Sequence, residues 1–186
     1  TPFDISTATF ETVINAQGDK PTGIALKPDG SKLYECDEGS GLIFESDLST
    51  PFEIATASLN QSISSVSDFP TDIHFKEDGT RLYEIGFPAD FDPDQIHQSD
   101  LSTPFDISTA SLDTTINAQG TSSQGVTVSS DGTILLESGT NNNNINQSQL
   151  SNPFDIGSAT LDKTIDPPGF GPAGLEYSQD GSILYQ

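Results

Sequence analysis

Apolar and polar residues alternate in short runs that recur along the chain. In the run 57–63, Ala57, Leu59 and Ile63 alternate with polar residues, and a similar alternation occupies 8–14, 110–116 and 159–165. A period of two is typical of a β-strand, whereas the 3.6-residue period of an amphipathic helix is missing. We therefore expect an all-β fold in which each run forms a strand, with one face buried and the other in water.

Two dipeptides define a repeat. Pro-Phe pairs begin at residues 2, 51, 104 and 153, and Asp-Gly pairs begin at residues 29, 78, 131 and 180. Both series have spacings of 49, 53 and 49 residues, and Asp-Gly always follows Pro-Phe after 27 residues. A fixed period of this length indicates a repeat architecture. We divide a single domain, 1–186, into repeats at approximately 1–49, 50–102, 103–151 and 152–186.

Each repeat predicts four short antiparallel strands. A first strand such as GIALK (23–27) leads into Asp-Gly, a favoured hairpin turn because glycine adopts positive φ without a steric cost. A second strand such as KLYEC (32–36) and a third such as LIFESDL (42–48) follow, and the alternating run is the fourth. Four such strands in about 49 residues are typical of a β-propeller blade. We expect three complete blades at 22–66, 70–117 and 124–166.

A fourth blade is split between the two ends of the chain. The alternating run 8–14 precedes the first complete blade, and two inner strands follow the third. Three explanations remain open. The chain is part of a longer propeller, or it closes as a four-bladed ring with a short last blade, or a neighbouring subunit supplies the missing strand by β-addition.

The segments DGSKLYE (29–35), DGTRLYE (78–84), LIFESDLSTPFEIATASL (42–59) and IHQSDLSTPFDISTASL (96–112) share one motif. They resemble the propeller repeats of phage structural proteins and of bacterial and archaeal surface proteins, whose consensus is near DGTKLYV…IYQYDLSTPWDISTASY. The resemblance covers nearly the whole chain, but Phe replaces the usual Trp after Pro, which reduces aromatic packing. It implies a propeller on a virion or cell surface and does not imply one particular chemistry.

The charge balance narrows the range of partners. Six Lys and Arg against 28 Asp and Glu give a net charge of −22, which repels phosphate groups. We therefore expect no nucleic-acid partner, and no apolar run approaches the roughly 18 residues of a membrane span. Cys36 is the single cysteine, so an internal disulfide framework is excluded. The polar, Lys-poor composition favours an extracellular, cell-surface or virion location.

One insertion interrupts the period, around GFPADFDPDQIHQ (86–98). Asp90, Asp92 and Asp94 alternate there like the first ligands of a calcium loop, although no Gly follows at the sixth position and no Glu at the twelfth. The alternative is a solvated acidic loop. Calcium is the one cofactor that the sequence suggests.

Further candidate positions concern recognition and glycosylation. Phe87, Phe91 and His97 in the insertion form the candidate surface for a glycan or a receptor. Asn60 and Asn146 each begin an Asn-Gln-Ser sequon, which accepts a glycan where the source modifies such sites.

Three glutamates, Glu35, Glu84 and Glu137, occupy equivalent second-strand positions, and Gln186 occupies the fourth. They form a ring that lines a shared surface or a cation site, or else they point sideways or into solvent. A group present in every blade is better explained by the repeat than by an active site.

His74 and His97, without cysteines or a fixed short spacing, are weak zinc ligands. A Gly-x-Ser-x-Gly elbow is also missing.

These observations favour a non-enzymatic structural or adhesive propeller. It would belong to a virion appendage or to an extracellular filament or surface layer, with copies of itself or other structural subunits as partners. A carbohydrate- or receptor-binding module is the alternative. A lactonase-like or lyase-like propeller with a metal in its central channel is the third hypothesis.

Overall fold

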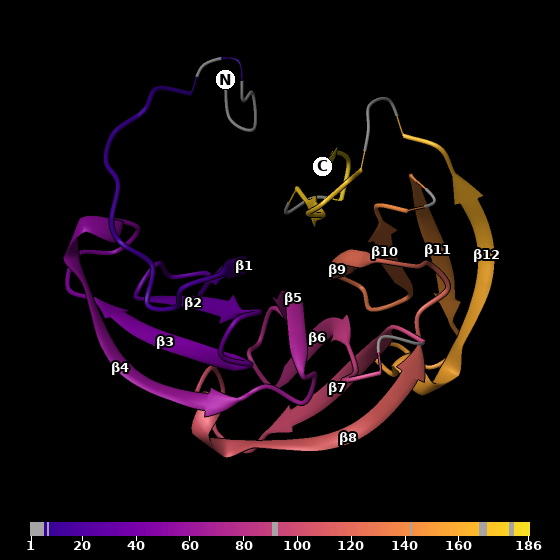
Figure 1. Ribbon diagram of the computed structural model, residues 1–186, viewed down its shortest axis with the longest axis horizontal. Coiled ribbons are helices and arrows are strands. Elements are labelled where there is room, and N and C mark those ends of the chain that lie inside the picture. The colour runs from indigo at the N-terminus through magenta and orange to yellow at the C-terminus, as the bar shows by residue number, and fades with distance from the viewer. Residues whose placement is uncertain (1–5, 7, 91–92, 142, 168–170, 179–180) are drawn as a thin grey trace.

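The computed structural model describes residues 6, 8–90, 93–141, 143–167, 171–178 and 181–186. Three antiparallel sheets of four strands stand side by side on an open arc (Figure 1). The first blade contains β1 (Pro21–Leu26), β2 (Lys32–Asp37), β3 (Leu42–Leu48) and β4 (Ala57–Ser64). The second contains β5 (Phe69–Phe75), β6 (Arg81–Phe87), β7 (Gln95–Leu101) and β8 (Ala110–Asn117). The third contains β9 (Ser123–Val128), β10 (Ile134–Gly139), β11 (Asn144–Leu150) and β12 (Ala159–Ile165).

Each sheet is a meander in which sequence neighbours pair, so the predicted blades are confirmed to within two residues at their ends. One turn of 3₁₀ helix separates the third and fourth strands of each blade, at Ile54–Thr56, Ile107–Thr109 and Ile156–Ser158. A short hairpin of β13 (Glu176–Tyr177) and β14 (Leu184–Tyr185) begins a fourth blade. The fold is therefore an all-β propeller arrangement with three complete blades and a short fourth.

The strand expected at 8–14 is a correction to the sequence prediction. The described residues of this segment form no strand, and Phe10 is 84% exposed. The equivalent runs β4, β8 and β12 are strands because each pairs with the third strand of its blade. Alternation alone does not make a strand where the described chain offers no such partner.

The outer strands also bury less than their alternation predicts. In β4, Ala57 and Ile63 are half-buried, but Leu59 is 49% exposed. The pairing with β3 shifts register between Glu45 and Ser46, so β4 contains a bulge, and β8 and β12 shift at the equivalent place. A bulge changes which side chains share a face. Leu112 and Leu161 are exposed in the same way as Leu59.

The core lies between the blades. One buried cluster joins the first and second blades and another joins the second and third. Tyr34 and Cys36 of β2 pack in the first cluster with Ile73 and Phe75 of β5. Because one face of each blade is covered by the next, the second strands β2, β6 and β10 are buried almost throughout.

Every Pro-Phe pair in the described residues sits on the Asp-Gly turn of its own blade. Phe105 donates its N–H to the carbonyl of Gly79 at 3.0 Å, and its φ of 61° is unusual for a residue with a side chain. Gly79 has a φ of 73°, and a Cβ there would collide with the Phe105 ring. Phe52 on Gly30 and Phe154 on Gly132 repeat this arrangement.

The same turn also joins each blade to the one before it. Tyr34 of the first blade donates its Oη–H to the carbonyl of Phe105 at 2.6 Å, and Glu45 Oε2 accepts the N–H of Ile107 at 3.2 Å. Tyr83 and Gln98 make the equivalent bonds to the third blade. The motif Pro-Phe-Asp-Ile is therefore a docking element between blades, in addition to a marker of the repeat.

Candidate functional site

The repeated glutamates hold the linkers between blades. Glu35, Glu84 and Glu137 are buried rather than solvent-facing. Each accepts a hydrogen bond from the linker that enters its blade, with N–H donors at Gln17 (2.6 Å), Val66 (3.0 Å) and Gly120 (2.7 Å). Burial raises the pKa of Glu84 and of Glu137. The structure thus favours glutamates that point sideways and hold the linkers over glutamates that line a shared surface or a cation site.

The two described aspartates of the insertion after β6, Asp90 and Asp94, have different surroundings. Asp90 is exposed in the turn after β6, whereas Asp94 is buried and accepts the N–H of Ser123 in the third blade at 2.7 Å. Asp92 lies outside the described residues. Within the part of the chain that the structure describes, no three His, Cys, Asp or Glu side chains are placed to hold a metal ion. Calcium binding here remains a prediction, and the Asp94 carboxylate already forms a hydrogen bond between the second and third blades.

Of the three residues predicted to form a contact surface in the insertion, His97 is buried. His97 is 4% exposed on β7, and its Nδ1 lies 2.9 Å from Thr115 Oγ1. Burial lowers the pKa of His97 to about 4, so the ring is neutral at physiological pH. His97 is therefore a core residue and not a contact residue. Phe87 is half-buried, and Phe91 lies outside the described residues.

The two sequons differ in accessibility. Asn60 is exposed on β4. Asn146 is 2% exposed, donates to Glu137 Oε1 at 3.0 Å and accepts the hydroxyl of Thr164 at 2.7 Å. A glycan on Asn146 would need this buried amide to leave the sheet. Of the two sequons, the folded chain therefore accommodates a glycan only at Asn60.

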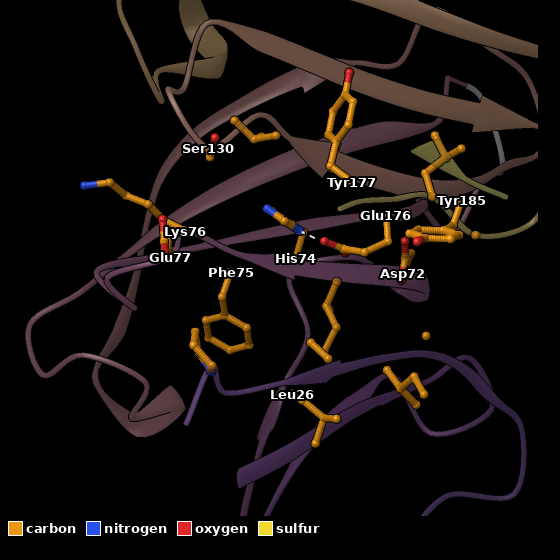
Figure 2. A pocket seen from close by; sticks show the side chains of 18 of the residues that line it. Leu26, Asp72, His74, Phe75, Lys76, Glu77, Ser130, Glu176, Tyr177 and Tyr185 are labelled. Atoms are coloured by element: carbon orange, nitrogen blue, oxygen red, sulfur yellow. Dashed lines mark ion pairs between the residues drawn. The ribbon is translucent and has the colours of Figure 1, made fainter. Parts of the chain in front are cut away.

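A cavity of about 820 Å³ lies where the inner strands of the blades meet (Figure 2). Asp72, His74 and Phe75 enter its wall from β5, and Glu176 and Tyr177 enter it from β13. Residues of β1 and β9 and of several turns also line it. This inner-strand channel is the candidate functional site, because concave pockets with a few converging polar groups are the usual ligand sites of proteins.

The repeat breaks down at the channel. Asp72 occupies the position that is glycine in the other three inner strands, at Gly23, Gly125 and Gly174. Two residues further on, each inner strand carries a different side chain, namely Ala25, His74, Thr127 and Glu176. By contrast, the Pro-Phe pair, the Asp-Gly pair and the second-strand glutamate recur in all three complete blades. Loss of the repeat at neighbouring channel positions is what recognition of an asymmetric ligand would require.

The polar groups of the channel meet across blades. His74 Nδ1 lies 3.7 Å from Glu176 Oε2 and 3.4 Å from Thr127 Oγ1. Asp72 Oδ2 accepts the N–H of Val126 at 3.0 Å. Burial, with a smaller contribution from the charge of Glu176, raises the pKa of Asp72 to about 7, although the hydrogen bond from Val126 acts in the opposite direction. Near neutral pH, Asp72 therefore both donates and accepts hydrogen bonds, and an imidazole and a second carboxylate lie beside it.

The sequence alone assigns His74 a weak zinc role and does not single out Asp72 or Glu176. The signal was present, because aligning the four inner strands residue by residue shows where the repeat is interrupted. Whether those positions face a cavity depends on how the blades pack, which the alignment does not show.

The described residues contain no helix that is long and apolar enough to span a bilayer. No protein-family model and no curated protein matches this sequence. Solved structures do match. A Bacteroides fragilis protein provisionally named a 6-phosphogluconolactonase is 18% identical with a TM-score of 0.59, covering 84% of this chain and 41% of its own.

Two further matches come from different proteins. The β-propeller domain of Cps50 (Swd1) from Myceliophteria thermophila is 17% identical with a TM-score of 0.56, covering 88% of this chain and 48% of its own. A chain of the mitotic checkpoint complex is 15% identical with a TM-score of 0.60, over 88% and 44% respectively. This chain thus spans less than half the length of these matches. At such identities the likeness concerns the fold alone, and the chain has the fold of a β-propeller.

Proposed function

We propose that this chain is a non-enzymatic structural or adhesive propeller that assembles with further copies in a virion appendage or an extracellular filament or surface layer. The observation that carries the proposal is the contact between blades, which is made twice by the same four-residue turn. The third blade presents the corresponding surface without such a turn on it among the described residues. A groove of about 250 Å³ lies there, lined by Leu136, Ile145 and Gln147 together with Gly181 and Leu184.

The first blade supports the same proposal from the other side of the arc. Phe52 is 60% exposed, whereas Phe105 in the second blade is 7% exposed because the first blade covers it. The exposed leucines of the outer strands add one apolar group per blade at the same place, namely Leu59, Leu112 and Leu161. Single exposed leucines occur on many protein surfaces, so the exposed ring of Phe52 carries the argument at this end of the arc.

Association is expected to depend on concentration and on salt. In sedimentation-velocity experiments, the mass should rise above 19.7 kDa as the chain is concentrated. Added salt should strengthen association, because it screens the repulsion between copies that each carry a charge of −22. A species that stays at the monomer mass across a wide range of concentration and salt would refute the proposed function.

Carbohydrate binding in the channel is a second candidate, favoured by the interrupted repeat around Asp72 and His74. Carboxylates and an imidazole bind sugar hydroxyls, and Tyr177 offers a ring face. We expect labelled chain to give signals on a glycan array that Glu176→Gln reduces and that Asp90→Asn, on an exposed loop, leaves unchanged. A blank array for the unmodified chain at high concentration would remove this candidate.

A further inference from the structure

We infer that the groove on the third blade is the seat of residues 2–5 of a second copy, so that copies join head to tail. The inference rests on the proposed function, because it specifies which surfaces make the self-association. It follows from a contact that the molecule makes twice within itself.

Each seat for a Pro-Phe-Asp-Ile motif has two halves. One half is an Asp-Gly turn, on which the Phe ring lies and to whose glycine carbonyl the Phe N–H donates. The other half is the preceding blade, where a third-strand side chain accepts the N–H of the Ile. Glu45 accepts from Ile107 at 3.2 Å, and Gln98 accepts from Ile156 at 3.1 Å.

The turn at Gly181 has no Phe ring on it among the described residues. Gly181 has a φ of 69°, close to the 72–73° of Gly30, Gly79 and Gly132. Those three glycines each touch a Phe ring, whereas a Cβ at Gly181 would meet no described atom within 4 Å. The remaining motif is Pro-Phe-Asp-Ile at residues 2–5, identical to 104–107 and 153–156. Its residues lie outside the described part of the chain.

The groove has the matching chemistry. Gln147 is the repeat equivalent of Gln98. Gln98 donates its Nε2 to Asp113 at 2.7 Å and uses its Oε1 for Ile156, and Gln147 donates its Nε2 to Asp162 at 3.0 Å. The same amide orientation thus leaves Gln147 Oε1 as an acceptor for the N–H of Ile5.

This seat should be weaker than those within the chain. Leu136 replaces the tyrosine that donates to the Phe carbonyl in the first two blades, at Tyr34 and Tyr83. Ser129 replaces Lys76, whose ammonium lies over the ring of Phe154 at 4.7 Å. Loss of a hydrogen bond and of a cation–π contact leaves apolar packing and one amide. Reversible association is the consequence.

The curvature of the arc favours a second copy over the chain's own residues 2–5. The blades superpose on 48% of the Cps50 propeller domain, so one copy follows the curvature of a ring about twice its size. Figure 1 shows the N-terminal segment beyond the first blade, at the other end of the arc from β12. Gln17, bonded to Glu35 at 2.6 Å, holds the base of that segment on the first blade. Two copies joined at both ends would close a two-fold ring.

The first test uses the synthetic peptide TPFDISTATF, residues 1–10, with a fluorescent label. We expect it to bind the chain, and we expect Gln147→Ala to weaken both peptide binding and self-association by about tenfold, through loss of the acceptor. Gln149→Ala is the matched control, since Gln149 lies on the same strand, contacts the same Asp162 and is exposed. A peptide with Phe3→Ala should not bind. Thermal unfolding of each variant verifies that it is folded.

The second test identifies the donor of the motif. A chain with Phe3→Cys is mixed with a chain carrying Ser182→Cys, which lines the groove, and the mixture is oxidised. We expect a disulfide-linked pair of one chain of each kind, and Cys36 does not compete because it is fully buried. An internal disulfide in a doubly substituted chain, formed in preference to a linked pair, would assign the seat to the chain's own segment and overturn the inference.

The outcomes separate the inference from the function on which it rests. Association that persists unchanged in Gln147→Ala, with no cross-link, would refute the seat and leave self-assembly standing. Absence of association at every concentration would refute the proposed function itself. Peptide binding lost in Gln147→Ala and retained in Gln149→Ala, together with the mixed cross-link, would support both.

Discussion

Gly79→Ala is expected to lower the free energy of unfolding by about 3 to 4 kcal/mol, whereas Gly181→Ala should lower it by only about 1 kcal/mol. Both glycines have nearly the same positive φ, 73° and 69°, so the backbone strain of an alanine is alike at the two positions. They differ in their surroundings. A Cβ at Gly79 overlaps the ring of Phe105, whereas one at Gly181 meets no described atom within 4 Å.

The Phe105 ring has little room to yield. It is 7% exposed, packs 5.8 Å from the ring of Phe75, and its carbonyl accepts the hydroxyl of Tyr34. Urea unfolding of the two variants beside the unmodified chain measures the difference. Gly132→Ala, which meets Phe154 in the same way, should resemble Gly79→Ala. Equal losses for Gly79→Ala and Gly181→Ala would show that the ring is not held in its place.

Asp72→Asn is expected to stabilise the protein by up to about 4 kcal/mol above pH 7 and to have little effect near pH 4. The pKa of Asp72 is raised from 3.8 to about 7 in the folded chain, mainly by burial. The folded state therefore binds this proton more tightly than the unfolded state. The resulting stability is fully present below the unfolded pKa of 3.8 and is lost as the pH rises through 7.

Asparagine keeps an oxygen acceptor for the N–H of Val126 but has no proton to lose. Urea unfolding between about pH 4 and pH 8 should give a flatter stability curve for Asp72→Asn than for the unmodified chain. The free energy of unfolding of the variant should still fall somewhat as the pH rises, because burial also raises the pKa of Glu84 and of Glu137. Asp90→Asn removes the same charge from an exposed position and serves as the control. Parallel curves for Asp72→Asn and the unmodified chain would contradict a raised pKa.

The blades were predictable because their determinants are local. An Asp-Gly turn between two short apolar strands specifies a hairpin without reference to the rest of the chain, and the constant spacing extends that inference to every repeat. The strand at 8–14 was predicted by the same alternation and is wrong. Its hydrogen-bond partner would be the third strand of the fourth blade, and the described residues after β12 form only the hairpin of β13 and β14.

The candidate site depended on packing that a single sequence does not show. The sequence left open whether Glu137 lines a shared surface or cation site or points sideways or into solvent. Its hydrogen-bond partner, Gly120, belongs to a linker 17 residues earlier, and no local pattern indicates that contact. His97 was assigned to a surface loop, yet β7 carries it into the sheet interior. Asp72 is an acidic residue in a strongly acidic chain, and its significance emerges only when the inner strands are superposed. Electrostatic environment is a property of the assembled blades.

The docking turn has a consequence for how such a protein changes in length. Each blade recognises the next through a turn of four residues and a few acceptors and rings on the blade before it. A duplicated repeat therefore carries both surfaces of the interface between blades, and the flanking blades need no new surface. Blade number can therefore change in steps of one repeat, because the Phe-on-glycine contact and the acceptor for the Ile N–H are both encoded within the repeat.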